Sequence, residues 1–258
     1  MIVPVLMYHS VSRPGTPDLR PPGYWTTPEI FEAHLEALSS AGAAAVGLSD
    51  LLCFHRGEKT LPPRPVVITF DDGYLNNFQE ALPRLVRRGL TAVFFVTASA
   101  VGEPMMMGLP ELAELRKAGM EIGSHGMSHV LYSGLPRTRL EWELRESRRV
   151  LEAGLGAPVD FFSLPRGYLP RCLPRLAREA GYRGMCVSRP GRNRAATDPF
   201  LWRRLTVRCG DGPELLAGLW GRWGAGYLRW YLREKVRTLA RRRFALLRPP
   251  APDVSPGI

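Results

Sequence analysis

The chain alternates short apolar runs with amphipathic segments, and a glycine follows most of the amphipathic ones. Apolar runs typical of buried strands lie at 2–8, 66–70, 91–97, 120–123, 161–162 and 184–188. Apolar residues at helical spacing lie between them, at 28–42, 77–88, 110–118, 136–153 and 170–180. This alternation predicts a parallel α/β fold in which helices surround the strands, with a barrel as the favoured form.

The length of 258 residues suits one large domain with a buried core. No Pro-, Gly- or Ser-rich linker divides the chain into two compositionally distinct halves. We therefore predict one catalytic domain at 1–212 and a basic, aromatic-rich helical extension at 213–258.

Potential metal ligands directly follow two of the apolar runs. They are the acidic pair Asp71-Asp72 after residues 66–70, and His125 and His129 after residues 120–123. Taken alone, Asp-Asp-Gly is typical of a turn in which Asp caps the next helix, and His-x-x-x-His is modest evidence for a metal site. Together they supply one carboxylate and two imidazoles, the ligand set of a metal site that keeps a position open for water. Loops at the carboxyl ends of barrel strands carry the chemistry, so we expect one shared site there.

These stretches resemble the motifs of the polysaccharide deacetylases, the NodB-homology domain of carbohydrate esterase family 4. The similar segments are Thr69-Phe-Asp-Asp-Gly73, Ile122-Gly-Ser-His-Gly-Met-Ser-His129 and Phe162-Ser-Leu-Pro-Arg-Gly167, within a resemblance that covers roughly residues 2–210. The resemblance implies a distorted, incomplete (β/α) barrel. It also implies that Asp72, His125 and His129 hold a divalent metal and that Asp71 is the general base.

The resemblance implies a reaction as well, the removal of an acetyl group from an N-acetylated sugar, oligosaccharide or polysaccharide precursor. We expect Zn²⁺, with other divalent transition metals as alternatives, since such an ion lowers the pKa of its water to about 7. Two alternatives stay open. One is a deformylase or other amide hydrolase acting on a lipid-linked sugar, and the other is a non-catalytic glycan-binding relative.

An amine is a poor leaving group, so the reaction also needs a general acid. In many members of the resembled family this acid is a His near the C-terminal end of the domain, but here no His follows His129. The segment Val5-Leu-Met-Tyr-His-Ser-Val11 resembles the N-terminal motif of permuted relatives such as the biofilm poly-N-acetylglucosamine deacetylases, in which the catalytic His comes from that place. We therefore predict that His9 is the acid. The alternative is a half-buried His that caps a loop.

The loop Pro165-Arg166-Gly167 follows the apolar run at 161–162 and is the expected source of a backbone N–H for the oxyanion and of contacts with substrate. Arg166 stands where many of the resembled proteins have an aromatic residue. Its side chain either pairs with Asp71, binds an acidic substrate or faces solvent. Of the remaining histidines, we expect His34 to pack on the first helix or lie at its surface, and His55 to lie in a loop.

The formal net charge of +11 is concentrated in the tail, because residues 220–258 carry nine Arg or Lys against two acidic residues. At 213–248 the aromatic residues crowd one broad helical face: Trp220, Trp223, Tyr227, Trp230 and Tyr231. Such a basic amphipathic helix suits an anionic membrane surface, and the alternative is a helix packed on the barrel. No nucleic-acid motif is present, so we expect no nucleic-acid partner.

The remaining sequence signals concern the cellular compartment. Residues 1–9 lack a basic n-region and a small-residue cleavage site, and no segment approaches the ~20 apolar residues of a membrane span. Cys53, Cys172, Cys186 and Cys209 are scattered without short pair spacings, which favours reduced thiols. We therefore expect a cytoplasmic protein, either free or peripheral on the inner face of the membrane.

Overall fold

The computed structural model describes residues 1–15, 23–216, 218–221 and 225–246, without the side chains of 225, 226 and 238–246. All strand pairs within its main sheet are parallel. The strands of this sheet are β1 (Val5–Tyr8), β4 (Ala44–Ala45), β5 (Pro65–Phe70), β6 (Val93–Val96), β7 (Glu121–Ser124), β8 (Phe161–Ser163), β9 (Gly184–Val187), β10 (Trp202–Arg203) and β11 (Leu205–Thr206). The expected strands at 2–8, 66–70, 91–97, 120–123, 161–162 and 184–188 are all confirmed.

One extended segment closes the sheet into a barrel. The strand order is β10-β9-β8-β7-β6-β5-β1-β11, with β4 beside β5, and the two strands at the ends of this path are consecutive in the chain. Only Arg204 separates them, so residues 202–206 pair first with β9 and then with β1. The predicted distorted (β/α) barrel is therefore confirmed, and its closing strand is interrupted at Arg204.

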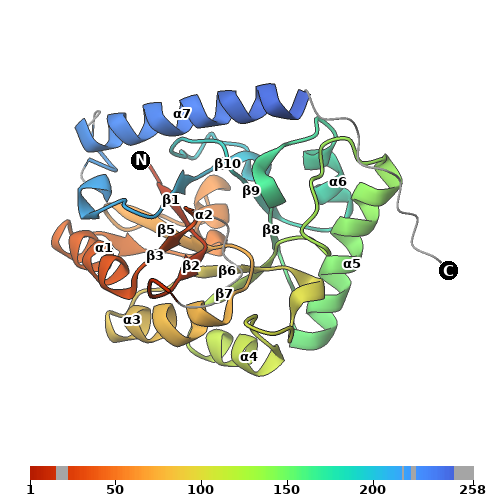
Figure 1. The fold of residues 1–258 in the computed structure, drawn as a ribbon, viewed down its shortest axis with the longest axis horizontal. Helices are drawn as coiled ribbons and strands as arrows, with labels where there is room; N and C mark the ends of the chain where they lie inside the picture. Colours follow the sequence, from red (N-terminus) through yellow and green to blue (C-terminus); the bar gives the residue numbers. More distant parts are fainter. Residues whose placement is uncertain (16–22, 217, 222–224, 247–258) are drawn as a thin grey trace.

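Helices surround the strands, as Figure 1 shows. They are α1 (Pro28–Ser40), α2 (Leu48–His55), α3 (Leu82–Arg87), α4 (Leu109–Lys117), α5 (Arg137–Leu155), α6 (Leu173–Glu179) and α7 (Ala225–Leu246). Thr27 caps α1 by accepting a hydrogen bond from the backbone N–H of Ile30. The loop expected around His55 is wrong, because this residue ends α2. A second, two-stranded sheet joins β2 (Ser10–Val11) to β3 (Trp25–Thr26).

Side chains of the strands alternate between two apolar clusters. On β5, Val66, Ile68 and Phe70 belong to a large cluster that includes residues of α1, α3, α4, α5 and α6, and therefore face the helices. Val67 belongs instead to a smaller cluster with Phe95, Phe161, Trp202 and residues of α2, which lies inside the barrel. The period of two predicts that Asp71, four residues after Val67, also points into the barrel.

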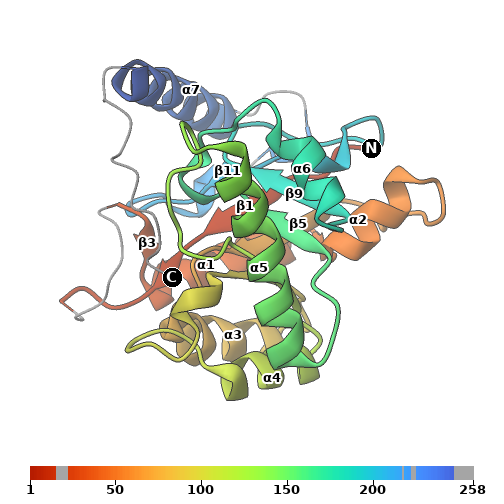
Figure 2. The ribbon, with the colours of Figure 1, turned by 90° about the vertical axis from the view of Figure 1, so that its right-hand side faces the viewer.

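The C-terminal helix packs on the barrel through its aromatic residues. Tyr227 and Trp230 are buried, and the Trp230 indole N–H donates to the Thr206 carbonyl at 2.8 Å. Figure 2 looks along α7 and shows it lying against one side of the molecule. The aromatic face expected to meet a membrane is thus occupied by the barrel where it is described. Trp223 lies outside the described residues.

Two further expectations concern the described residues as a whole. None of the helices described in residues 1–15, 23–216, 218–221 and 225–246 is both long and apolar enough to cross a membrane. The four cysteines all lie in this described part and form no disulfide there, as expected.

Candidate active site

The candidate residues gather at the carboxyl ends of four strands of the barrel, β1, β5, β7 and β8. Asp71 and Asp72 follow β5, His125 follows β7, Ser163 ends β8, and His9 follows β1. Parallel strands direct their carboxyl ends to the same rim, so segments far apart in sequence converge there. Asp71, Asp72 and His125 are all buried, whereas the His129 side chain is 33% exposed.

Asp72, His125 and His129 form a cluster whose ligand atoms all lie within 4.8 Å of one another. Asp72 Oδ1 lies 3.2 Å from His125 Nε2 and 3.1 Å from His129 Nε2. Despite these short distances, Oδ1 is buried and makes no hydrogen bond with the described residues. Ligands bonded at ~2.0–2.1 Å to a tetrahedral zinc ion lie roughly 3.3 Å apart, so this donor set fits a divalent metal.

The outer nitrogen of His125 is held by the protein. His125 Nδ1 lies 3.0 Å from the Ser163 carbonyl oxygen, which can only accept, so Nδ1 donates to it and Nε2 is the ring atom directed at Asp72. Metal-binding histidines commonly make this second contact, which fixes tautomer and ring direction. Asp71 and Asp72 raise the pKa of His125 above its usual value, although burial opposes this. Both imidazoles hold the pKa of Asp72 well below its usual range, again against burial.

Strained backbone also marks this rim. Asp72, His129 and Arg166 have φ values of 78°, 51° and 57°, in the left-handed region that costs non-glycine residues energy. Three of the five such residues described in the chain therefore lie at the site. The helix-capping alternative for Asp72 is wrong, because its carboxylate faces the two histidines instead of a helix end.

Asp71 points into the barrel and pairs there with Arg204. Arg204 Nη1 donates to Asp71 Oδ1 at 2.7 Å and Nη2 donates to Oδ2 at 2.8 Å. Ser163 Oγ lies 3.2 Å from both carboxylate oxygens and also accepts from Arg204 Nη2. Burial alone would raise the pKa of Asp71, but the Arg204 guanidinium outweighs it and holds the pKa below its usual value. The carboxylate is therefore ionised at neutral pH.

His9 lies at the same rim and is half-buried. Burial lowers the pKa of its imidazole, while the nearby charges of Asp72 and Asp71 act in the opposite direction. The backbone N–H of Asp71 donates to the Tyr8 carbonyl oxygen at 3.0 Å, so the segment that carries His9 lies directly beside the acidic pair.

The loop expected to contact substrate forms a short 3-10 helix, Pro165–Gly167, directly after β8. Arg166 is exposed, and its Nε donates to the His129 carbonyl oxygen at 3.2 Å. Of the three alternatives for Arg166, pairing with Asp71 is therefore wrong, since Arg204 takes that place. The loop instead braces the backbone of a candidate ligand.

A buried carboxylate on α5 holds the segment that carries His129. Glu143 is fully buried and accepts hydrogen bonds from the backbone N–H groups of Met127 and Ser128 at 2.9 and 3.1 Å. The Ser128 hydroxyl also donates to it, and Arg139 Nη2 pairs with it at 3.0 Å. These bonds fix the backbone on the N-terminal side of His129 and support its left-handed conformation.

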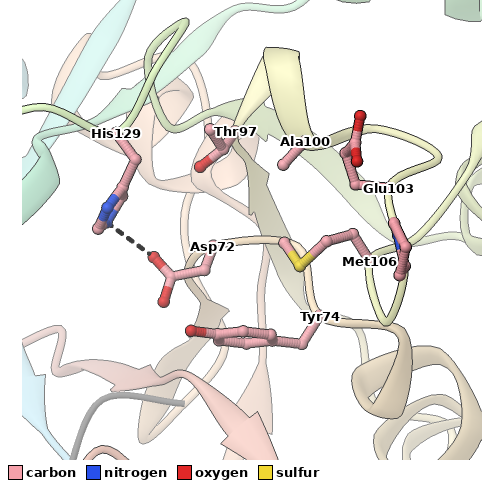
Figure 3. Close-up of a pocket in the computed structure, with 8 residues that line it drawn as sticks. Asp72, Tyr74, Thr97, Ala100, Glu103, Met106 and His129 are labelled. Carbon is pink, nitrogen blue, oxygen red and sulfur yellow. Dashed lines mark ion pairs between the residues drawn. The ribbon is translucent and has the colours of Figure 1, made fainter. Parts of the chain in front are cut away.

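A pocket of about 450 Å³ opens beside the metal cluster. Figure 3 shows Asp72 and His129 pointing toward one another at one end of it, with the aromatic ring of Tyr74 below Asp72. Thr97, Ala100, Glu103, Pro104 and Met106 complete the lining. An isolated β-bridge between Tyr74 and Met106 joins two of its walls. The pocket gives a substrate group direct access to the candidate ligands.

The sequence motifs missed Arg204, Ser163 and Glu143. Arg204 is one of 32 arginines, so its residue type alone carried no signal. Ser163 lies inside the Phe162–Gly167 motif, yet a single serine gives no indication of a role. Glu143 lies in an amphipathic helix, in which a charged residue ordinarily faces solvent. Only the pattern of buried residues around it indicates that this side chain points inward.

Comparison with known proteins finds one family that is similar to the chain over the residues of this site. The polysaccharide deacetylase family model matches residues 58–185, which include Asp71, Asp72, His125 and His129. The chain is 27% identical over 210 residues to Bacillus subtilis YxkH, whose name assigns it provisionally to the polysaccharide deacetylases. Over these residues the chain is similar to the polysaccharide deacetylase family. The YxkH alignment covers 81% of this chain and 72% of the relative.

Other deacetylases are similar over different lengths. A peptidoglycan-N-acetylglucosamine deacetylase of Bacillus cereus is 29% identical over 118 residues, which cover 45% of this chain and 53% of that protein. The structure of IcaB from Ammonifex degensii is 26% identical with a TM-score of 0.70, covering 79% of this chain and 91% of that one. The Streptococcus pyogenes deacetylase PplD, solved with acetate, shares the fold at 20% identity and a TM-score of 0.75, covering 84% of this chain and 96% of that one. His9 lies outside the matched residues 58–185, so its role stays a prediction.

Proposed function

We propose that this protein is a metal-dependent N-deacetylase of the polysaccharide deacetylase family that releases acetate from an N-acetylated sugar within a glycan. The observation that carries the proposal is the convergence of Asp72, His125 and His129, in which a buried Asp72 oxygen makes no hydrogen bond with the described residues. The paired carboxylate of Asp71 lies beside it. The names of the relatives support the acetylated glycan as the substrate class.

The ligand set favours zinc among the divalent metals, since two imidazoles and one carboxylate are a common catalytic zinc set. When bound, such an ion polarises the amide carbonyl and lowers the pKa of a water molecule to about 7. Asp72, His125 and His129 would hold it, and Ser163 and the Arg166 loop would keep two of these ligands in place.

Two groups of the chain, Asp71 and His9, carry the proton transfers. Asp71, held ionised by Arg204, accepts a proton from the attacking water at a carboxylate oxygen. The new C–O bond forms as the amide π bond opens, and a backbone N–H of the Pro165–Gly167 loop would stabilise the oxyanion. His9 then donates a proton to the amide nitrogen, the C–N bond breaks, and acetate and a free amine leave.

Acetate release from N-acetylglucosamine oligomers tests this proposal. We expect turnover by the metal-loaded protein, no turnover after exhaustive chelation, and recovery when Zn²⁺ is added back. Asp71→Asn serves as the matched control, because it should bind metal in full yet release no acetate. Full turnover by metal-free protein would refute the metal mechanism, and preferential release of formate from N-formyl oligomers would favour the deformylase alternative.

A further inference from the structure

The His9 ring is positioned by packing. Its Nδ1 is buried and has no hydrogen-bond partner among the described residues. A histidine that transfers protons usually has its tautomer and direction set by a hydrogen bond to the second nitrogen. Here the ring meets Tyr24 instead, with ring centroids 4.7 Å apart and planes inclined at 62°, an edge-to-face arrangement. We propose that Tyr24 is a positioning residue for His9 and that a buried ion pair anchors Tyr24 to the C-terminal helix.

Arg208 holds Tyr24 in two ways. Its guanidinium carbon lies 4.2 Å from the centroid of the Tyr24 ring, and its Nη2 donates to the Tyr24 hydroxyl at 3.0 Å. The first contact fixes the plane of the ring and the second fixes its direction. Tyr24 is thus clamped between the imidazole of His9 and a guanidinium.

Arg208 in turn is fixed by Glu234 on α7. Arg208 Nε donates to Glu234 Oε1 at 2.8 Å and Nη2 donates to Oε2 at 3.1 Å. Both residues are buried, at 8% and 5% exposure. A buried ion pair adds little net stability compared with apolar side chains of the same volume, but its forked geometry fixes direction. This pair therefore suits a positioning role better than a purely stabilising one.

The backbones around these side chains are joined as well. The N–H of Ser10, next to His9, donates to the Tyr24 carbonyl oxygen at 3.4 Å. The N–H of Cys209, next to Arg208, donates to the Gly23 carbonyl oxygen at 3.2 Å. The segments that carry His9, Tyr24 and Arg208 are therefore linked independently of their side chains.

This chain of contacts gives the extension beyond residue 212 a part in the active site. Glu234 on α7, Arg208 after β11 and Tyr24 before β3 connect the helix to His9. The inference rests on the proposed function, because it takes His9 as the general acid. We place the functional boundary of the catalytic unit after Glu234, beyond the domain limit expected at residue 212.

Steady-state kinetics on N-acetylglucosamine oligomers with the full-length, zinc-loaded protein test the proposal. We expect Tyr24→Ala to lower kcat about 10- to 100-fold with KM and zinc content unchanged, because a small misplacement of a reacting group has effects of this size. Tyr24→Phe keeps the ring contacts with His9 and Arg208 but loses the hydroxyl's hydrogen bond, so its kcat should fall less than that of Tyr24→Ala. Glu234→Gln should lower kcat in the same direction, with retained folding checked by circular dichroism.

The decisive comparison uses the His9→Ala background. There Tyr24→Ala should cause no further loss of kcat, since a residue that acts through His9 has nothing left to position. Full additivity, or a rise in KM at unchanged kcat, would overturn the proposal and make Tyr24 a substrate contact. An unchanged kcat in folded Glu234→Gln would overturn the link to α7.

Tyr231→Ala is the matched control, because this half-buried tyrosine of α7 stacks on Tyr227 and has no described ring contact with His9. It should leave kcat unchanged, and an equal loss in Tyr231→Ala would also count against the proposal. If Tyr24→Ala does not fold, Tyr24→Leu gives the same comparison with the apolar volume retained. The parent protein is assayed before any variant. If it releases no acetate, the proposed function is refuted, and the positioning proposal is not the cause.

Discussion

Arg204 and Asp71 form a buried, two-pronged ion pair inside the barrel, with both nitrogen–oxygen distances below 3 Å. The pair joins the interrupted strand that closes the barrel to the segment after β5 that also carries the candidate metal ligand Asp72. Closure of the fold and ionisation of the candidate base therefore depend on the same contact.

Replacing Arg204 should affect both properties. In Arg204→Met the buried Asp71 loses its counter-charge, so we expect a loss of about 3–5 kcal/mol in the free energy of unfolding at neutral pH. Burial then raises the pKa of Asp71, and the acidic limb of kcat/KM should move to higher pH. Urea unfolding and pH–rate profiles measure the two effects. The double variant Asp71→Asn/Arg204→Met removes the unpaired charge and should recover part of the lost stability.

Replacing His9 should separate chemistry from metal binding. His9→Ala is expected to lower kcat about 10²–10⁴-fold, the usual contribution of general acid–base catalysis. Zinc content should be unchanged, because His9 is not among the three candidate ligands. Acetate assays and elemental analysis on the same preparation test this, and an unchanged rate would make His9 a structural residue.

Replacing a candidate ligand should affect metal binding first. Asp72→Asn keeps the shape of the side chain but removes the negative charge that faces both imidazoles. We expect zinc affinity to fall at least about tenfold, the effect typical even of outer-shell changes. Isothermal titration calorimetry on the apo protein measures it, with Asp71→Asn as the control of equal charge. Equal affinities of the two variants would argue against the assigned ligand set.

Glu143 should influence zinc through the backbone. Glu143→Gln keeps an acceptor for one N–H group but loses the pairing with Arg139 and the shared bonds to Met127 and Ser128. We expect zinc affinity to fall about 10- to 100-fold, although Glu143 is not in the ligand cluster. Glu146→Gln is the control and should leave affinity unchanged, because this half-buried residue of the same helix pairs with Arg149. Parental affinity in Glu143→Gln would show that the His129 segment is held by other contacts.

His34 should make stability depend on pH. It is fully buried between the Tyr8 hydroxyl and the Asp211 carbonyl oxygen, at 3.1 and 3.0 Å, and burial lowers its pKa. The unfolded chain binds a proton near pH 6.5 and the folded chain only at lower pH, so stability falls as pH decreases below about 6.5. Urea unfolding between pH 5 and 7.5 should show a shallower dependence for His34→Gln than for the parent protein. Equal slopes would contradict this assignment.

The sequence by itself determined the barrel and the candidate metal ligands. Strands and helices follow from the period of apolar residues, which is local, and Asp72 and His125 directly follow strands whose carboxyl ends must share a rim. The local sequence did not show which other residues contact the site. Arg166 lies in a recognised motif, yet it faces solvent and contacts the His129 backbone.

Only the tertiary structure decided which charges and rings support the site. Asp71 and Arg204 are 133 residues apart, and they meet because residues 202–206 close the barrel and turn Arg204 inward. The tail likewise carried an aromatic and basic pattern that suited a membrane, but packing directs Trp230 and Glu234 into the barrel wall. Coulombic and packing energies depend on distance and burial. The many arginines of the chain look alike in local sequence, so only folding decides which of them is buried beside Asp71.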